Sequence, residues 1–148
     1  MITLATADHI QAMAKLGADY YAQSRFSQYA EYNETQAYEY IKNAIINPLC
    51  YVDVLVVDSQ VQGFTIAHAG PQAWSSNLAC NVAFIYIAPE HRTGGWETVF
   101  VERIEAWAQE HKMDEIIIGD YAMQPDRTQK LTEHWGYNTV GYIGVKRV

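Results

Sequence analysis

The sequence predicts an α/β fold with one domain, and three observations support this prediction. Segments of strand and helix periodicity follow one another in the order β-α-α-β-β-β-α-β-α-β-β. No linker, repeat or low-complexity tract divides the 148 residues, so we expect a single domain over residues 1–148. Hydrophobic residues make up 49% of the chain and charged residues 18%, which is enough apolar surface for a core of its own.

The N-terminal part is expected to form a short strand, two helices and a hairpin. Thr6 is a suitable N-cap for the first helix. The side chain of Asn33, three residues before Gln36, can cap the second helix, and Pro48 ends it. Segments rich in β-branched residues then flank the turn 58–60, as in a hairpin. The expected elements are a strand at 2–4, helices from 7 to about 21 and from 34 to 47, and strands at 51–57 and 61–67.

The C-terminal part is expected to alternate strands and helices. Apolar residues such as Ile104 and Trp107 recur at helical spacing after Gly95. The run 116–118, three isoleucines, indicates a strand in the centre of the sheet. Pro125 suits the first turn of a last helix, which Gly136 ends. The expected elements are strands at 79–88 and 114–120, helices from about 96 to 111 and from 125 to 135, and closing strands at 138–140 and 142–146.

The junction between the strand at 79–88 and the next helix is the best indication of function. It reads Pro89-Glu90-His91-Arg92-Thr93-Gly94-Gly95. A tight turn of this kind leaves backbone N–H groups pointing out of the helix start, where the helix dipole favours negative charge. The junction is therefore suited to hold a phosphate. The alternative is a plain strand-to-helix turn in which Gly94 and Gly95 supply positive φ.

Two segments of the C-terminal half carry the pattern of a known family. The first is Ile85-Tyr86-Ile87-Ala88-Pro89-Glu90 followed by Arg92-Thr93-Gly94-Gly95-Trp96-Glu97, and the second is Leu131-Thr132-Glu133-His134-Trp135-Gly136-Tyr137. They resemble the Gcn5-related N-acetyltransferases (GNAT), in which Arg or Gln, two residues, Gly, one residue, and Gly or Ala open the central helix. The resemblance implies a central mixed, mostly antiparallel twisted sheet flanked by helices.

The resemblance also implies a site for coenzyme A, with acetyl-CoA as co-substrate and no metal. Backbone N–H groups of residues 93–97 would hold the pyrophosphate, and the exposed backbone of residues 85–87 would pair with the pantetheine arm. Arg92 would add a charge-assisted contact or only brace the loop. The implied cofactor-binding residues are Ile85, Tyr86, Ile87, Arg92, Thr93, Gly94, Gly95, Trp96 and Glu97.

Two positions depart from the family pattern. Glu97 stands where relatives usually carry Gly or Ala, and its carboxylate would repel a pyrophosphate unless its side chain turns outward. Thr132 stands where many relatives have a Tyr that protonates the departing thiolate. The strand segment 81–85 also lacks the carboxylate that some relatives use as a base.

Other residues are therefore considered for catalysis and for acceptor binding. Tyr121 and Asp120 follow the fifth strand, whose end should open toward the thioester; alternatively they pack on the sheet and cap a turn. Tyr29, Glu31 and Tyr32 lie between the first two helices, where they could receive a cationic amine, or the aromatic residues could pack the helices onto the sheet.

The function expected from the resemblance is acetyl-CoA-dependent transfer of an acetyl group to a primary amine, on a small molecule or a protein. The alternative, which Glu97 and Thr132 permit, is a catalytically silent CoA-binding or protein-interaction module of the same fold. Neither the acceptor nor the acyl-chain length follows from these residues. Edge strands at the end of the chain could pair into a homodimer.

Composition excludes other classes of function. The net charge of −7 disfavours binding to nucleic acid. No apolar stretch is long enough to span a membrane, and the N-terminus does not read as a signal peptide, so we expect a cytoplasmic protein. Cys50 and Cys80 have no metal-like spacing and are expected to be ordinary buried thiols, and the five histidines are scattered.

Overall fold

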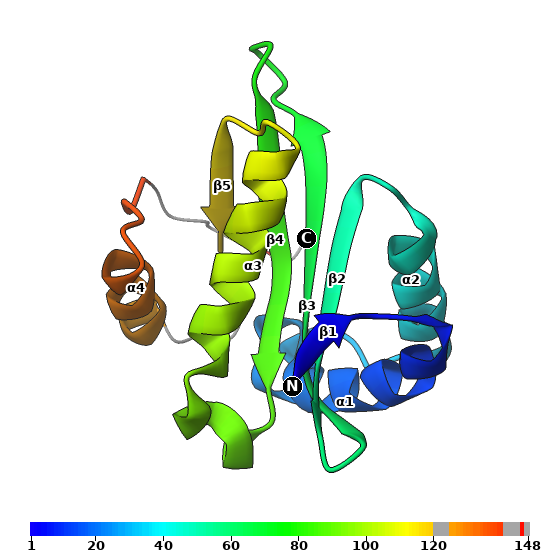
Figure 1. Cartoon of the computed structure of the whole chain (residues 1–148). Helices are drawn as coiled ribbons and strands as arrows, with labels where there is room; N and C mark the ends of the chain where they lie inside the picture. The colour runs from blue at the N-terminus through cyan, green and yellow to red at the C-terminus, as the bar shows by residue number, and fades with distance from the viewer. Residues whose placement is uncertain (120–124, 141–145, 147–148) are drawn as a thin grey trace.

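The described strands form one five-stranded sheet with helices on both faces (Figure 1). The computed structural model describes residues 1–119, 125–140 and 146. The strand order is β1-β2-β3-β4-β5, in which β1 to β4 are antiparallel neighbours and β5 runs parallel to β4. This arrangement confirms the predicted α/β class with a mixed, mostly antiparallel sheet.

The elements of the N-terminal half follow the sequence prediction closely. The side chain of Asn33 accepts a hydrogen bond from the N–H of Gln36 at 2.9 Å, which is the predicted cap of the second helix. Asp58 and Ser59 have φ angles of 49° and 64°, as a two-residue hairpin turn requires. The elements are β1 Ile2–Leu4, η1 Ala7–His9, α1 Ile10–Gln23, η2 Arg25–Gln28, α2 Glu34–Ile46, β2 Cys50–Val57 and β3 Gln60–Pro71.

The C-terminal half contains the predicted alternation of strands and helices. Gly136, with φ of 85°, ends the last helix. Its N–H donates to the backbone carbonyl of Glu133, and the N–H of Tyr137 donates to that of Thr132, which is a Schellman motif. The elements are β4 Leu78–Ile87, η3 Pro89–Gly94, α3 Trp96–Glu110, β5 Glu115–Ile118 and α4 Pro125–His134.

Two predictions for the end of the chain differ from the structure. The strand expected to be central, β5, lies at the end of the sheet formed by the described strands, and Ile117 is 45% exposed. Its three isoleucines resemble a buried strand in composition, but composition does not give the number of neighbouring strands. Residues 138–140, expected as a strand, are irregular, with Val140 95% exposed. The predicted strand 142–146 lies outside the described residues except for Lys146.

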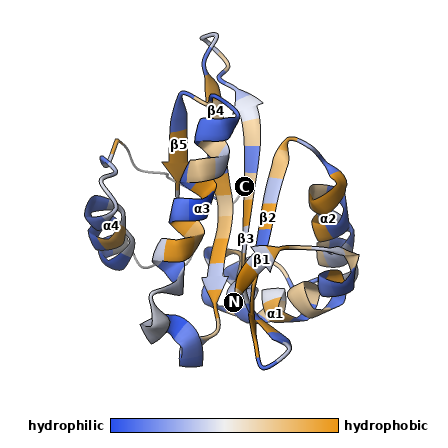
Figure 2. Ribbon diagram, viewed as in Figure 1, coloured by the Kyte–Doolittle hydropathy of each residue, from blue (hydrophilic) through white to orange (hydrophobic). Residues whose placement is uncertain are grey.

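Each face of the sheet packs against its own helices. On one face, α1 and α2 contribute Ile10, Met13 and Ile41 to a cluster with β2, β3 and β4. On the other face, α3 packs Ile104 and Trp107 against the sheet. Figure 2 shows many hydrophobic residues along the strands and a mixture of hydrophobic and hydrophilic residues along the helices. No helix in the described ranges is both long and apolar enough to cross a membrane.

A buried carboxylate connects α3 to the sheet. Asp53 on β2 is fully buried, and it accepts hydrogen bonds from Nε of Arg103 at 2.6 Å, from a second guanidinium nitrogen of Arg103 at 3.2 Å, and from the Tyr51 hydroxyl at 2.6 Å. Burial and the bond to Asp53 raise the pKa of Tyr51, so its hydroxyl stays protonated. The carboxylate is thus paired and its oxygens are satisfied.

We predict that Arg103→Ala lowers the free energy of unfolding by about 3 kcal/mol, because it leaves the Asp53 carboxylate buried without its cation. This value is at the low end for buried pairs since the Arg103 side chain is 38% exposed. Urea denaturation measures the change. Glu102→Ala, at the exposed neighbouring position, is the control. Equal stability of the two variants would contradict the structural role of the pair.

Candidate active site

A cleft opens between β4 and β5 because of a bulge in β4. β5 pairs with the first part of β4 and ends at the Val82–Ile118 pair (Figure 1). At the same point the β3–β4 register shifts: Val82 pairs with Ala67 and Phe84 with Ile66, so Ala83 has no partner on β3. A bulge of this kind bends its strand and increases its twist. No described strand pairs with the β5-side edge of β4 beyond Val82.

The cleft has a volume of about 100 Å³ and is lined by residues from both halves of the chain. Apolar side chains of β4 and β5 make up part of the lining, and α4 contributes one charged, one polar and one apolar side chain. Its lining residues are Tyr20, Val82, Ala83, Ile85, Glu97, Ile118, Gly119, Arg127, Thr128, Leu131 and Trp135. The cleft therefore lies at the edge that the bulge leaves open.

The start of α3 provides backbone donors beside the cleft. Gly95, the N-cap of α3, has φ of 72°, in the left-handed region that favours glycine. The first N–H to bond within the helix is that of Val99, which donates to Gly95 at 3.4 Å, so the N–H groups of residues 96–98 have no partner inside the helix. Together with the helix dipole they form a place for an anion.

Not all residues of the predicted phosphate-binding loop lie at the start of α3. Thr93 and Gly94 lie in the 3-10 helix η3, where backbone N–H groups donate to carbonyls three residues earlier. Gly94 does not have the positive φ that the alternative, a plain turn, gave it, whereas Gly95 does. A Cβ at Gly94 would lie 2.5 Å from Nε1 of Trp96. The Trp96 side chain packs beside Ile87 and Phe100, and its indole also lies against Gly94 in the loop.

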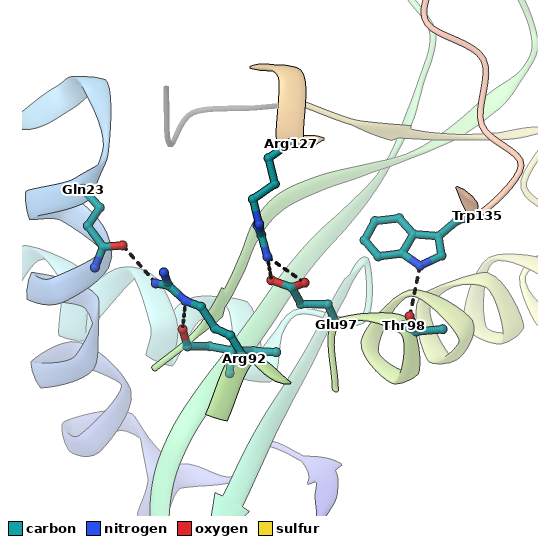
Figure 3. Close-up of polar contacts among 7 residues, drawn as sticks. Gln23, Arg92, Glu97, Thr98, Arg127 and Trp135 are labelled. Atoms are coloured by element: carbon teal, nitrogen blue, oxygen red, sulfur yellow. Dashed lines mark hydrogen bonds and ion pairs between the residues drawn. The ribbon is translucent and has the colours of Figure 1, made fainter. Parts of the chain in front are cut away.

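Arg92 is used to brace the loop. Its Nε donates to the Ile87 carbonyl and its terminal nitrogen to the side-chain oxygen of Gln23, both at 2.9 Å (Figure 3). The guanidinium also lies 5.6 Å from the ring centre of Tyr86, whose hydroxyl accepts from Gln23 at 3.3 Å. Of the two roles considered for Arg92, the structure shows the bracing contacts, which join the ends of β4 and α1.

Glu97 faces the cleft and is paired. One terminal nitrogen of Arg127, on α4, donates to both carboxylate oxygens of Glu97 at 2.7 and 2.9 Å (Figure 3). The Glu97 side chain is 18% exposed and that of Arg127 49%. The carboxylate that should repel a phosphate is therefore accompanied by a cation that sequence reasoning did not connect to it.

Further contacts hold α4 over the cleft, and one of them engages the expected catalytic position. Nε1 of Trp135 donates to the Thr98 hydroxyl at 3.1 Å (Figure 3). The Thr132 hydroxyl donates to backbone carbonyls of its own helix, those of Thr128 at 2.9 Å and Gln129 at 3.0 Å. Thr132 thus directs its proton back to α4 and does not line the cleft.

The predicted acceptor residues do not line the cleft, but a neighbour of theirs does. The Tyr32 hydroxyl donates to the Ala14 carbonyl, and burial raises its pKa. Tyr29 and Glu31 are exposed. Tyr20 lines the cleft, with its ring 5.3 Å from that of Phe84. Its place on the helical stripe of α1 together with Met13 was the signal that could have identified it as facing the sheet.

The predicted catalytic residues Asp120 and Tyr121 lie outside the described residues. They remain predictions. Gly119 is the last described residue before them and lines the cleft.

Comparisons with known proteins show which solved structures share this fold. No family model matches the sequence, and no curated protein matches it either. Solved structures do match over the full length of the chain. They include a ribosomal-protein-alanine N-acetyltransferase from Brucella melitensis biovar Abortus 2308, with a TM-score of 0.74, 20% identity and 99% of that chain covered.

Two further matches carry other names. An aminoglycoside antibiotic 6'-N-acetyltransferase from Acinetobacter baumannii matches with a TM-score of 0.77 and 13% identity over 100% of this chain and 97% of that one. A transcriptional regulator from Bacillus halodurans C-125 matches with a TM-score of 0.80 and 15% identity over 100% and 98%. The chain has the fold of the Gcn5-related N-acetyltransferases, as predicted.

We predict that Gly95→Ala destabilises the protein by about 1–2 kcal/mol, because an alanine is strained at a φ of 72°. The free energy of unfolding in urea measures this. Gly70→Ala is the matched control, since a Cβ there meets nothing within 4 Å and its φ is not positive. If both glycines tolerate alanine equally, the left-handed turn at the start of α3 is not as described.

Proposed function

We propose that this protein is an acetyl-CoA-dependent N-acetyltransferase that acts on a primary amine. One observation carries the proposal: the bulge at Ala83 frees an edge of β4 and opens a cleft that lies beside the start of α3. A pantetheine arm offers amide groups that can pair with a free strand edge, and a diphosphate suits unpaired N–H groups at a helix start. The fold shared with N-acetyltransferases supports the same conclusion.

The residues present fit coenzyme A in a specific way. Backbone groups of residues 85–87 would hold the pantetheine arm, and the N–H groups of residues 96–98 would hold the diphosphate. Bound acetyl-CoA would supply the activated acetyl group. Arg92 would act indirectly, by fixing the end of β4 to which the loop is attached. The assignment of Ile85, Tyr86 and Ile87 to the pantetheine arm is the one predicted from the sequence. The proposed diphosphate contacts differ, because they come from residues 96–98 at the start of α3 instead of residues 93–97.

Acetyl transfer needs an amine without its proton. A lysine-like amine has a reference pKa near 10.4 and an α-amine one near 7.7–8.0, so at pH 7 the neutral fraction of the α-amine is several hundred times larger. Thr132 is not among the described residues that line the cleft, and Glu97, which is, pairs with Arg127. Orientation of the two substrates would therefore contribute more to the rate than a strong base. Asp120 and Tyr121 remain the proposed catalytic residues.

The second candidate is a CoA-binding module without turnover. The engagement of Thr132 within α4 favours it, because this side chain cannot replace the Tyr that many relatives have in the last helix. The similarity to a transcriptional regulator shows that the fold is not confined to proteins named as transferases.

The two candidates predict different outcomes with acetyl-CoA. We expect acetyl-CoA at 100 times its Kd to stabilise the protein by about 2.7 kcal/mol. We also expect free thiol to be released with an amine panel, faster with peptide α-amines than with lysine side chains at pH 7. Stabilisation without thiol release would indicate the binding module. No stabilisation would exclude both candidates.

The Glu97–Arg127 pair gives a second test. We predict that Arg127→Ala weakens CoA binding by about fivefold, because the diphosphate would then lie near the unpaired Glu97 carboxylate. Repulsion between nearby charges in water costs roughly 1 kcal/mol, which corresponds to this factor. Glu97→Gly should strengthen binding by a similar factor. Titration calorimetry measures both, and S-acetylpantetheine, which lacks the diphosphate, is the control ligand. Equal effects on both ligands would mean that the pair acts only on the structure of α4.

A further inference from the structure

Three side chains that can exchange a proton lie in contact outside the cleft. Cys50 begins β2, and His68 is its cross-strand partner on β3. The Cys50 sulfur lies 3.0 Å from Nδ1 of His68, and the Tyr40 hydroxyl of α2 lies 2.6 Å from Nε2. Both ring nitrogens of His68 are therefore engaged. A thiol, an imidazole and a phenol in this order correspond to a nucleophile, a base and a group that orients the base.

The backbone holds this cluster in place. The N–H of Cys50 donates to the Asn47 carbonyl at 3.0 Å, and the Leu49 carbonyl accepts from the N–H of Ala69 at 2.7 Å. The Tyr40 ring meets the His68 ring edge-on at 5.9 Å. A nucleophile and base on paired strands keep their separation without an ordering cost at the moment of reaction.

The two cysteines of the chain differ in environment. Both were expected to be buried, and Cys80 is, with no exposed surface. Cys50 is only partly buried, which corrects the prediction, because it lies at the first residue of its strand rather than inside it. Tyr40 is 40% exposed, so the cluster is open to solvent on its α2 side. Cys50 therefore keeps part of its surface exposed, while Cys80 is enclosed.

The protonation states suit a base-assisted thiol. Burial lowers the pKa of His68 below its ordinary value, so its ring is neutral at pH 7 and can accept a proton. Burial raises the pKa of the Cys50 thiol, which therefore keeps its proton at rest. Burial and the neighbouring Cys50 raise the pKa of Tyr40 to about 12, so the phenol does not compete as an acid.

We propose that Cys50 is a nucleophilic thiol that forms mixed disulfides with low-molecular-weight disulfides, with His68 as its base and Tyr40 as the residue that positions His68. In the tautomer that this requires, Nε2–H donates to the Tyr40 oxygen and Nδ1 faces the thiol.

In this exchange the Cys50 sulfur attacks one sulfur of the disulfide. A new S–S bond forms and the original one breaks, so Cys50 is oxidised and the departing thiol is reduced. Nδ1 of His68 takes the Cys50 proton and returns it to the departing sulfur. The proposal does not depend on the acetyltransferase proposal, because none of its residues lines the cleft.

The test follows modification of the intact protein by glutathione disulfide at pH 7 with mass spectrometry and peptide mapping. We expect the adduct on Cys50 and not on Cys80. His68→Asn should slow the reaction of Cys50 at least about tenfold in the folded protein and leave its rate unchanged in denaturing urea. Tyr40→Phe, which keeps the ring, should slow it less than His68→Asn does.

Each variant serves as its own control, because the rate in urea measures the reactivity of the Cys50 thiol when the folded contacts are lost. Thermal unfolding shows whether the variants are folded, and His68→Gln replaces His68→Asn if that variant is not. Equal modification of Cys50 and Cys80 in the folded protein would overturn the proposal. So would a rate in folded His68→Asn that equals the rate of the unchanged protein.

Discussion

The bulge at Ala83 is the constraint on which the rest of the architecture depends. Before it, Val82 pairs with Ala67 on one side and Ile118 on the other; after it, Phe84 pairs with Ile66 alone among the described strands. Because a bulge bends the strand, β4 leaves β5 at this point. The position of the bulge thus sets where the cleft opens, and the remaining length of β4 sets where α3 begins relative to it.

One charged pair beside the cleft serves the fold as well as the site. The Glu97 carboxylate at the start of α3 interacts favourably with the helix dipole, and Arg127 on α4 compensates its charge. The same contact holds α4 against α3, where the Trp135–Thr98 hydrogen bond also acts. The carboxylate of Glu97 is therefore part of the attachment of α4.

Local signals in the sequence were sufficient for most elements of the fold. The cap at Asn33 and the left-handed Gly136 fix helix ends through contacts within a few residues, which a sequence pattern can indicate. The Glu97–Arg127 pair joins residues 30 apart and has no such pattern. The bulge at Ala83 depends on the paired strands, and Ala83 itself is an ordinary strand residue. The Cys50–His68 contact depends on register, where a slip of one residue would move one partner to the other face.

The polar groups in and around the cleft and those of the Cys50 cluster differ in what their hydrogen bonds do. Arg92, Glu97 and Thr132 use theirs to hold neighbouring elements or their own helix, which makes a rigid site that orients bound groups. In the cluster of Tyr40, His68 and Cys50, each bond joins two groups that can exchange a proton. Positional rigidity favours transfer between two bound molecules, since orientation supplies much of the rate. A linked thiol and imidazole favour chemistry on the protein itself, and the separation of these two sets of residues allows each to act without the other.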